Sequence, residues 1–123
     1  MRYWKTEHDM ALEKLLHMPG IVGISEPVQW SAREVQLYKP DGTGLITDID
    51  LIYKTEKGIY VAEYKCTDTQ RKKAEHQLEL AKGFIEDQYS ITPKMLYVFG
   101  DRFRTQPYLG SGRYECEKDK KKI

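Results

Sequence analysis

The segment GLITDIDLIYKTEKGIYVAEYK, residues 44–65, holds two apolar runs that carry acidic residues and one lysine. Residues 45–53 alternate as the residues of a β-strand do, and so do residues 59–66. Between the runs, residues 55–58 form a short polar connection with a glycine, which is typical of a hairpin loop. We therefore predict two neighbouring strands joined by a turn.

Side chains two residues apart on a strand share a face, and this rule predicts where the charged residues of the hairpin point. On the first strand it places Ile52 with two aspartates on one face, opposite Ile49. On the second strand it places one glutamate and one lysine on a common face. If the strands pair, these charged residues gather at one end of one sheet face: Asp48, Asp50, Glu63 and Lys65.

Carboxylates side by side repel one another unless a positive charge lies between them, and hard divalent cations such as Mg²⁺ prefer oxygen ligands. The cluster therefore indicates either a cation site or a surface ion-pair network of Asp50, Glu63 and Lys65. The position of the pattern on two predicted strands that lead into a helix favours the cation site.

The same residues carry a family resemblance. Asp50-Leu51-Ile52 on one strand and Glu63-Tyr64-Lys65 on the next resemble the motif of the PD-(D/E)XK nuclease superfamily, with Ile49 where that family usually has proline. The resemblance covers about residues 7–100. It implies an α/β fold with a mixed central sheet flanked by helices, in the order α-β-β-β-α-β, as in restriction endonucleases.

The resemblance also implies a set of metal ligands. Asp50 and Glu63 are expected to bind Mg²⁺, with Mn²⁺ able to substitute. The backbone carbonyl of Tyr64 and the carboxylate of Asp48 are further candidate ligands. Glu7, on the first helix, is the candidate for the glutamate that this family often adds, although a first-turn helix-dipole role suits it equally.

Lys65 is expected to position the attacking water and to offset charge on the transition state. The helix predicted over residues 70–89 carries Gln77 on its apolar stripe, where a buried amide needs a polar partner. By resemblance, Gln77 supports Lys65 or the substrate, and a plain helix-end contact is the alternative. The helix predicted over residues 6–18 starts at Thr6 as its N-cap. His8 lies on the stripe of that helix and is interpreted as structural, with substrate contact left open.

Five basic residues are candidates for contact with the phosphate backbone of DNA: Arg71, Lys72, Lys73, Arg102 and Arg104. Residues 1–64 hold 7 Lys and Arg against 10 Asp and Glu, and residues 65–123 hold 13 against 9. A basic second half suits a phosphodiester substrate, but ordinary solvated faces explain so modest a difference equally well.

The remaining predictions concern organisation. The 123 residues suit one domain, with a nuclease-like core over residues 1–104 and a C-terminal extension with a basic tail over residues 105–123. Residues 21–24 are predicted as a short extended piece, residues 34–38 as the first strand and residues 94–100 as a buried strand after the long helix. Neither a transmembrane run nor a signal peptide is evident, which indicates a cytoplasmic protein.

These features predict a Mg²⁺-dependent nuclease acting on DNA, structure-specific in repair or recombination, with a homodimer as an expectation from the family. The alternatives are a nuclease-like module that binds DNA or protein without cutting, and a nuclease directed at RNA.

Overall fold

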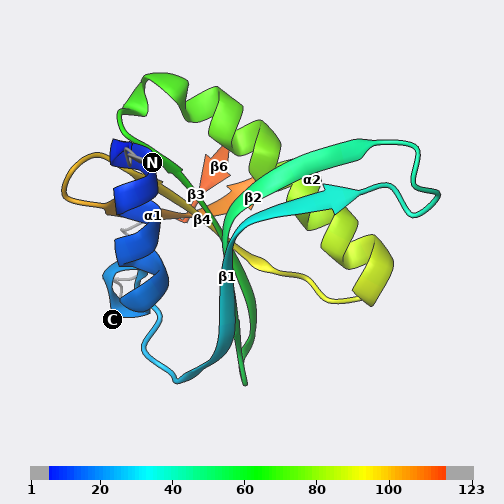
Figure 1. The fold of residues 1–123 in the computed structure, drawn as a ribbon, viewed down its shortest axis with the longest axis horizontal. Coiled ribbons are helices and arrows are strands. Elements are labelled where there is room, and N and C mark those ends of the chain that lie inside the picture. The colour runs from blue at the N-terminus through cyan, green and yellow to red at the C-terminus, as the bar shows by residue number, and fades with distance from the viewer. Residues whose placement is uncertain (1–5, 116–123) are drawn as a thin grey trace, which may run out of the picture.

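A computed structural model describes residues 6–115 of the chain. Its helices are α1 (Glu7–His17), η1 (Pro19–Val22), η2 (Asp68–Gln70) and α2 (Arg71–Tyr89), and its strands are β1 (Val28–Tyr38), β2 (Leu45–Thr55), β3 (Gly58–Lys65), β4 (Lys94–Phe99), β5 (Arg104–Gly110) and β6 (Arg113–Tyr114). The strands form one sheet in chain order, in which β3 and β4 run parallel and all other neighbours antiparallel (Figure 1). The predicted order α-β-β-β-α-β is confirmed.

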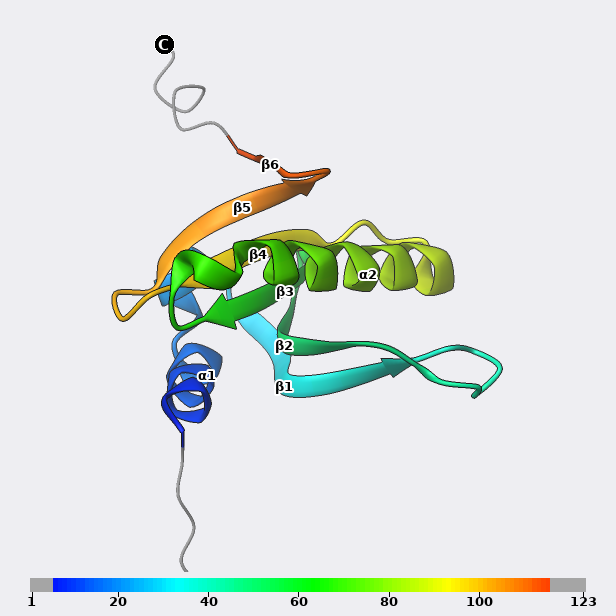
Figure 2. The same ribbon diagram turned by 90° about the horizontal axis from the view of Figure 1, so that it is seen from above.

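Helices cover both faces of the sheet, α1 on one side and α2 on the other (Figures 1 and 2). The α1 helix contributes Leu12 and Leu15 to a core that includes Tyr53 and Ala62 of the sheet. The other core joins Ala74, Leu78, Ala81 and Ile85 of α2 to Val61, Tyr97 and further sheet residues. Burial of these apolar side chains on both faces is the main stabilising contribution of such a layered fold.

The α1 helix begins where the sequence predicts. Thr6 is the N-cap, its Oγ1 accepts from the backbone N of Asp9 at 3.0 Å, and Asp9 Oδ2 accepts from the N of Thr6 at 3.3 Å. This reciprocal capping box satisfies two backbone donors of the first turn. The extended piece predicted over residues 21–24 is wrong. Pro19 instead starts a 3₁₀ turn, which ends at Gly23 with φ of +89°, a conformation that glycine adopts without strain.

The alternation of strand faces fails at Asp50. Ile49 and Ile52 are three residues apart, yet both pack in the core on the α2 side, whereas Leu51 packs on the α1 side. The prediction that Ile49 and Ile52 face opposite sides is therefore wrong. The register places Glu34 of β1 opposite Asp50, and Glu34 has φ of +55°. A residue with left-handed backbone angles interrupts the pleat of a strand. The positive φ of Glu34 and the failed alternation at Asp50 therefore belong to one local break in the sheet.

Because glycine alone adopts positive φ without a Cβ penalty, Glu34→Gly should be more stable than Glu34→Ala by about 1 kcal/mol. Gln36 supplies the matched control, since it is exposed on the same strand and has ordinary backbone angles. There the order should reverse, because glycine weakens a regular strand. Urea unfolding of the four variants measures both differences in stability. If the alanine variant were the more stable one at both positions, the inferred break in the strand at Glu34 would be wrong.

Residues after 104 continue the sheet. The β5 strand pairs with β4 and the short β6 pairs with β5, so residues 104–114 belong to the same six-stranded sheet. The boundary between residues 104 and 105 stays a prediction, and the tail over residues 116–123 lies outside the described residues. Within residues 6–115, neither α1 nor α2 is long and apolar enough to span a membrane.

Candidate active site

The site is built on Asp50 of β2 and Glu63 of β3, where the two strands separate. Asp50 donates its backbone N–H to Glu63 Oε1 at 3.2 Å, and Tyr64 donates its backbone N–H to Asp50 Oδ2 at 2.8 Å. The regular ladder between these strands starts one position further along, at Leu51 and Ala62. Each carboxylate thus binds a backbone donor of the opposite strand. This exchange holds both side chains at the end of the hairpin, as the sequence predicts.

Glu63 is only 1% exposed, and its Oε2 is buried without a hydrogen-bond partner among the described residues. Burial and the neighbouring Asp50 carboxylate raise the pKa of Glu63 to about 9. Burial also acts against the charge of Asp50, but the hydrogen bonds from His8 and the Tyr64 amide hold the pKa of Asp50 below its ordinary value. Without a cation, these opposite shifts favour a proton on Glu63 over one on Asp50.

An orphaned carboxylate oxygen beside a charged carboxylate fits a bound cation. Mg²⁺ is usually held by one or two carboxylates and completes its shell with water and substrate phosphate. Within residues 6–115, no group of three or more His, Cys, Asp or Glu side chains is arranged to hold a metal. Asp50 and Glu63 thus fit a hard cation shared with a substrate better than a closed metal cage.

Two predicted ligands lie apart from this pair. Glu7, in the first turn of α1, and Asp48, on β2, are both exposed. Within the described chain, neither makes a hydrogen bond or ion pair with Asp50 or Glu63. The carbonyl of Tyr64 follows Glu63 directly on β3, but the contact seen here is made by its amide. The ligand roles of all three remain predictions.

The residue of α1 that reaches the site is His8, not its neighbour Glu7. His8 Nε2 lies 3.4 Å from Asp50 Oδ2, and its ring centroid lies 5.8 Å from that of Tyr64. The hydrogen bond to Asp50 raises the pKa of His8. Its position on the apolar stripe was visible in the sequence. A polar residue on the apolar face of the first helical turn faces the sheet, and here it faces the end of the sheet where Asp50 lies. This rule could have identified His8 as a site residue.

Lys65 and Gln77 come together as the sequence predicts. Lys65 Nζ donates to Gln77 Oε1 at 3.0 Å, which connects the end of β3 to the buried side of α2. Among the described residues, no ion pair joins Lys65 to Asp50 or Glu63. The alternative of a surface ion-pair network among these three is therefore wrong.

Arg71 is engaged within the fold. It donates to both carboxylate oxygens of Asp68 at 2.9 and 3.0 Å and to Gln106 Oε1 at 2.9 Å. Its guanidinium carbon also lies 4.9 to 5.5 Å from the centroids of three aromatic rings, those of Tyr97, Phe99 and Tyr114. These contacts tie the start of α2 to the far strands of the sheet.

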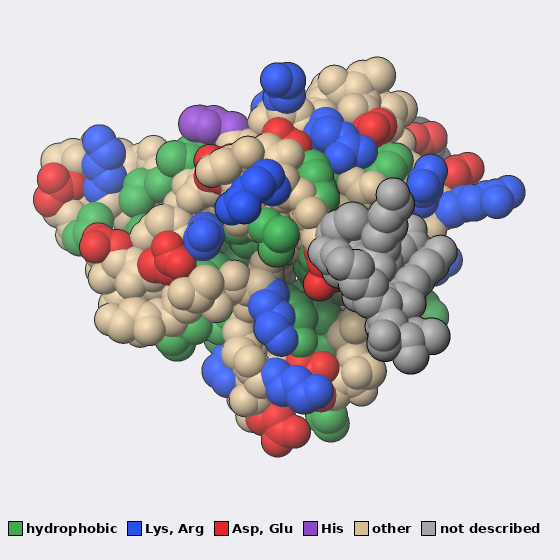
Figure 3. All heavy atoms as spheres, turned by 180° about the vertical axis from the view of Figure 1, so that it is seen from behind, with side chains coloured by type: hydrophobic (Ala, Val, Ile, Leu, Met, Phe, Trp, Pro, Cys, Tyr) green, Lys and Arg blue, Asp and Glu red, His purple; other side chains and the backbone are tan. Residues whose placement is uncertain are grey.

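The other four basic candidates are exposed: Lys72, Lys73, Arg102 and Arg104. Arg104 lies over the ring of Phe99, 5.6 Å from its centroid, and Phe99 pairs with Lys65 in the sheet. On the face in Figure 3, basic side chains are scattered among acidic and neutral ones. The position of Arg104 near Lys65 therefore supports the prediction of phosphate contact best.

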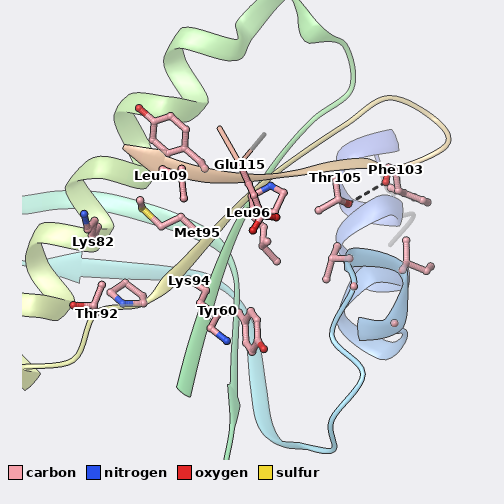
Figure 4. A pocket seen from close by; sticks show the side chains of 17 residues that line it. Tyr60, Lys82, Thr92, Lys94, Met95, Leu96, Phe103, Thr105, Leu109 and Glu115 are labelled. Atoms are coloured by element: carbon pink, nitrogen blue, oxygen red, sulfur yellow. Dashed lines mark hydrogen bonds between the residues drawn. The ribbon is translucent and has the colours of Figure 1, made fainter. Parts of the chain in front are cut away.

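A separate hollow of about 800 Å³ is lined by 17 residues (Figure 4), and Asp50 and Glu63 are not among them. Its lining includes Tyr60, Leu96 and Leu109 with the ammonium groups of Lys82 and Lys94, and none of the predicted site residues. This hollow and the carboxylate pair are therefore lined by different residues.

Comparison with known proteins supports the fold. No protein-family model and no curated protein matches the chain. Among solved structures it is similar to the crystal structure of a repair endonuclease from Pyrococcus abyssi, with a TM-score of 0.52, 20% identity and 80% of this chain covered. The match covers 39% of that protein, so this chain corresponds to less than half of its length. The fold is restriction-endonuclease-like, as the sequence predicts.

Proposed function

We propose that the chain is a Mg²⁺-dependent nuclease that hydrolyses phosphodiester bonds of DNA. The observation that carries the proposal is the buried Oε2 of Glu63, which has no hydrogen-bond partner within residues 6–115 and lies beside Asp50, with Lys65 close by on the same strand. The fold supports it, since a protein described as a repair endonuclease has a similar one. A role in repair or recombination on particular DNA structures is part of the proposal.

The side chains have separate tasks. Asp50 and Glu63 hold the cation, and Mg²⁺ supplies Lewis acidity at the phosphate and at water. The ammonium of Lys65 positions the attacking water and offsets charge that develops on the phosphate oxygens. Gln77 accepts from Lys65 and thereby fixes its direction. His8 orients the carboxylate of Asp50 from the side of α1.

DNA contact falls to the exposed cations near the end of β3. Lys72 and Lys73 lie on the first turn of α2, while Arg102 and Arg104 lie at the turn into β5. Backbone contacts of this kind position a strand without reading its sequence. A homodimer that acts on two strands, as the family resemblance implies, is the corresponding proposal for assembly, and light scattering of the purified protein tests it.

The test is cleavage of labelled single-stranded, duplex, flap and four-way-junction DNA, and of matching RNA, with Mg²⁺ or Mn²⁺. Wild type should cut DNA only with the cation, and Asp50→Asn should lose about 100-fold in rate. Asp41→Asn is the matched control, because this exposed carboxylate lies in the loop before β2, where it accepts hydrogen bonds from Thr43. It should retain most of the activity.

Each alternative gives its own outcome in the same experiment. Cutting confined to RNA would replace the DNA assignment. Binding of DNA without cutting, unchanged by Asp50→Asn, would support a non-catalytic module and contradict the proposal. The intact set of Asp50, Glu63 and Lys65 favours catalysis, since a binding module has no need of a buried carboxylate oxygen that finds no partner in the described part of the chain.

A further inference from the structure

Arg33 of β1 pairs with three carboxylates, those of Asp9 and Glu13 on α1 and that of its neighbour Glu34. Its Nη1 donates to the backbone O of Asp9 at 3.1 Å and to Glu13 Oε2 at 2.9 Å, and its Nη2 lies 3.2 Å from Asp9 Oδ1. Its Nε donates to Glu34 Oε1 at 2.7 Å. The side chain is 21% exposed, so these contacts are partly shielded from water.

The short α1 helix needs such a contact to be placed accurately. It has 11 residues and buries Ala11, Leu12 and Leu15, all beyond its first turn. Apolar packing fixes the middle of the helix but gives little control over its N-terminal end, since it is non-directional. Arg33 supplies directed, charge-assisted bonds to Asp9 in that first turn.

Asp9 directly follows His8, so the hydrogen bonds from Arg33 to Asp9 also restrict the position of His8. Arg33 pairs with Leu51 in the sheet, and Leu51 directly follows Asp50. A closed path of contacts therefore runs from Arg33 through the first turn of α1 to His8 and back to β2 at Asp50. Along this path the carboxylate of Asp50 is held from two sides, by His8 Nε2 and by the Tyr64 amide.

We infer that Arg33 is a positioning residue of the site: it sets the first turn of α1 so that His8 orients Asp50 for cation binding. This inference rests on the proposed function in one respect, that the pair binds a cation. Arg33 touches neither Asp50 nor Glu63 in the described structure, so its effect passes through His8.

A double-mutant cycle tests the path. Mn²⁺ affinity is measured by calorimetry for wild type, Arg33→Met, His8→Gln and the double variant. Each single substitution should weaken binding about tenfold, as loss of an orienting partner does. The double variant should be no weaker than His8→Gln alone, because Arg33 has nothing left to position. Removing a positive charge by itself would tighten cation binding, so simple electrostatics predicts the opposite sign for Arg33→Met.

A second readout needs no cation. The Tyr64 amide donates to Asp50 Oδ2, so its proton chemical shift reports the orientation of that carboxylate. Arg33→Met and His8→Gln should move it similarly. Thr55→Val is the control. It keeps the side-chain shape and removes a hydrogen bond to Glu26, which is not one of the contacts that link Arg33 to Asp50. It should lower the melting temperature without changing the Tyr64 amide or Mn²⁺ affinity.

The outcomes separate the two ideas. If Arg33→Met weakens Mn²⁺ binding by the same factor in the His8→Gln background, Arg33 acts only through general stability and the inference is overturned. If wild type binds no Mn²⁺, the proposed function is wrong about the cation, and the chemical shift of the Tyr64 amide alone tests the role of Arg33. A change shared by Arg33→Met and His8→Gln supports that role, and no change overturns it. Should Arg33→Met not fold, Arg33→Lys keeps the charge, loses the forked contacts and is expected to shift the amide in the same direction.

Discussion

Glu63→Gln will make the cation-free protein more stable and will reduce cleavage by at least about 1,000-fold. Burial and the nearby Asp50 charge raise the pKa of Glu63 to about 9, so near neutral pH the folded protein must keep a proton on this side chain that the unfolded chain releases. Glutamine resembles the protonated form and removes that cost. It also removes the second anionic ligand, which is why stability and activity change in opposite directions.

The pH dependence gives the sign of the effect. The pKa of Glu63 is raised from its ordinary value of 4.5 to about 9 in the folded protein. Wild type therefore loses stability as the pH rises through this range. The advantage of Glu63→Gln should therefore be smallest near pH 4.5 and grow by several kcal/mol as the pH rises to 8. Thermal melting in chelator at several pH values measures it.

Glu26→Gln is the matched control with the opposite sign. Hydrogen bonds from Tyr60 and Thr55 lower the pKa of Glu26 to about 2. Its contribution to stability is therefore present above pH 4.5 and lost as pH falls through about 2. The variant should melt below wild type at neutral pH and approach it in acid. A lower melting temperature for Glu63→Gln at pH 8 without cation would contradict the proton assignment.

Saturating Mg²⁺ should narrow the stability difference between the two proteins. A ligand present at 100 times its dissociation constant stabilises the folded state by about 2.7 kcal/mol, and only wild type has the site to gain this. Binding at pH 7.5 should also release close to one proton from Glu63, which calorimetry in buffers of different ionisation enthalpy detects.

The carboxylate pair could be predicted because its placement depends on local rules. Asp50 and Glu63 lie on strands joined by only two residues, Glu56 and Lys57, so hairpin register brings them together without knowledge of the rest of the fold. Gln77 was predictable for a similar reason, since a polar residue on a buried helical stripe must find a partner. The helix limits followed from the Thr6 cap and the apolar repeat.

The features that refine the site depend on contacts distant in sequence. His8 meets Asp50 across 42 positions, and Arg33 meets Asp9 across 24. No periodic pattern encodes such pairs. The positive φ of Glu34 has no composition signal either, because glycine or asparagine would be the usual residue there. The β5 strand was missed because Pro107 lies inside it, and a proline within a run argues against a strand unless the strand is peripheral.

Lys65→Met will lower the cleavage rate by about 100- to 1,000-fold while leaving cation affinity unchanged or higher. Lys65 Nζ bonds to Gln77 rather than to either carboxylate, so the pair does not depend on it for its arrangement. Its charge is of the same sign as the cation, and removing it cannot weaken cation binding by electrostatics. Single-turnover cleavage and Mn²⁺ calorimetry on the same samples measure the two quantities.

Gln77 variants then separate the presence of the ammonium from its direction. Gln77→Leu removes the acceptor that holds Lys65 Nζ at 3.0 Å and should cost about tenfold in rate. Gln77→Glu keeps an acceptor oxygen at the same place and should lose less. If Gln77→Leu were silent while Lys65→Met was inactive, the lysine would need no orientation, and its role would reduce to bulk charge beside the phosphate. If Lys65→Met weakened Mn²⁺ binding as much as it slowed cleavage, the lysine would act by shaping the carboxylate pair, and its proposed task at the water and phosphate would be wrong.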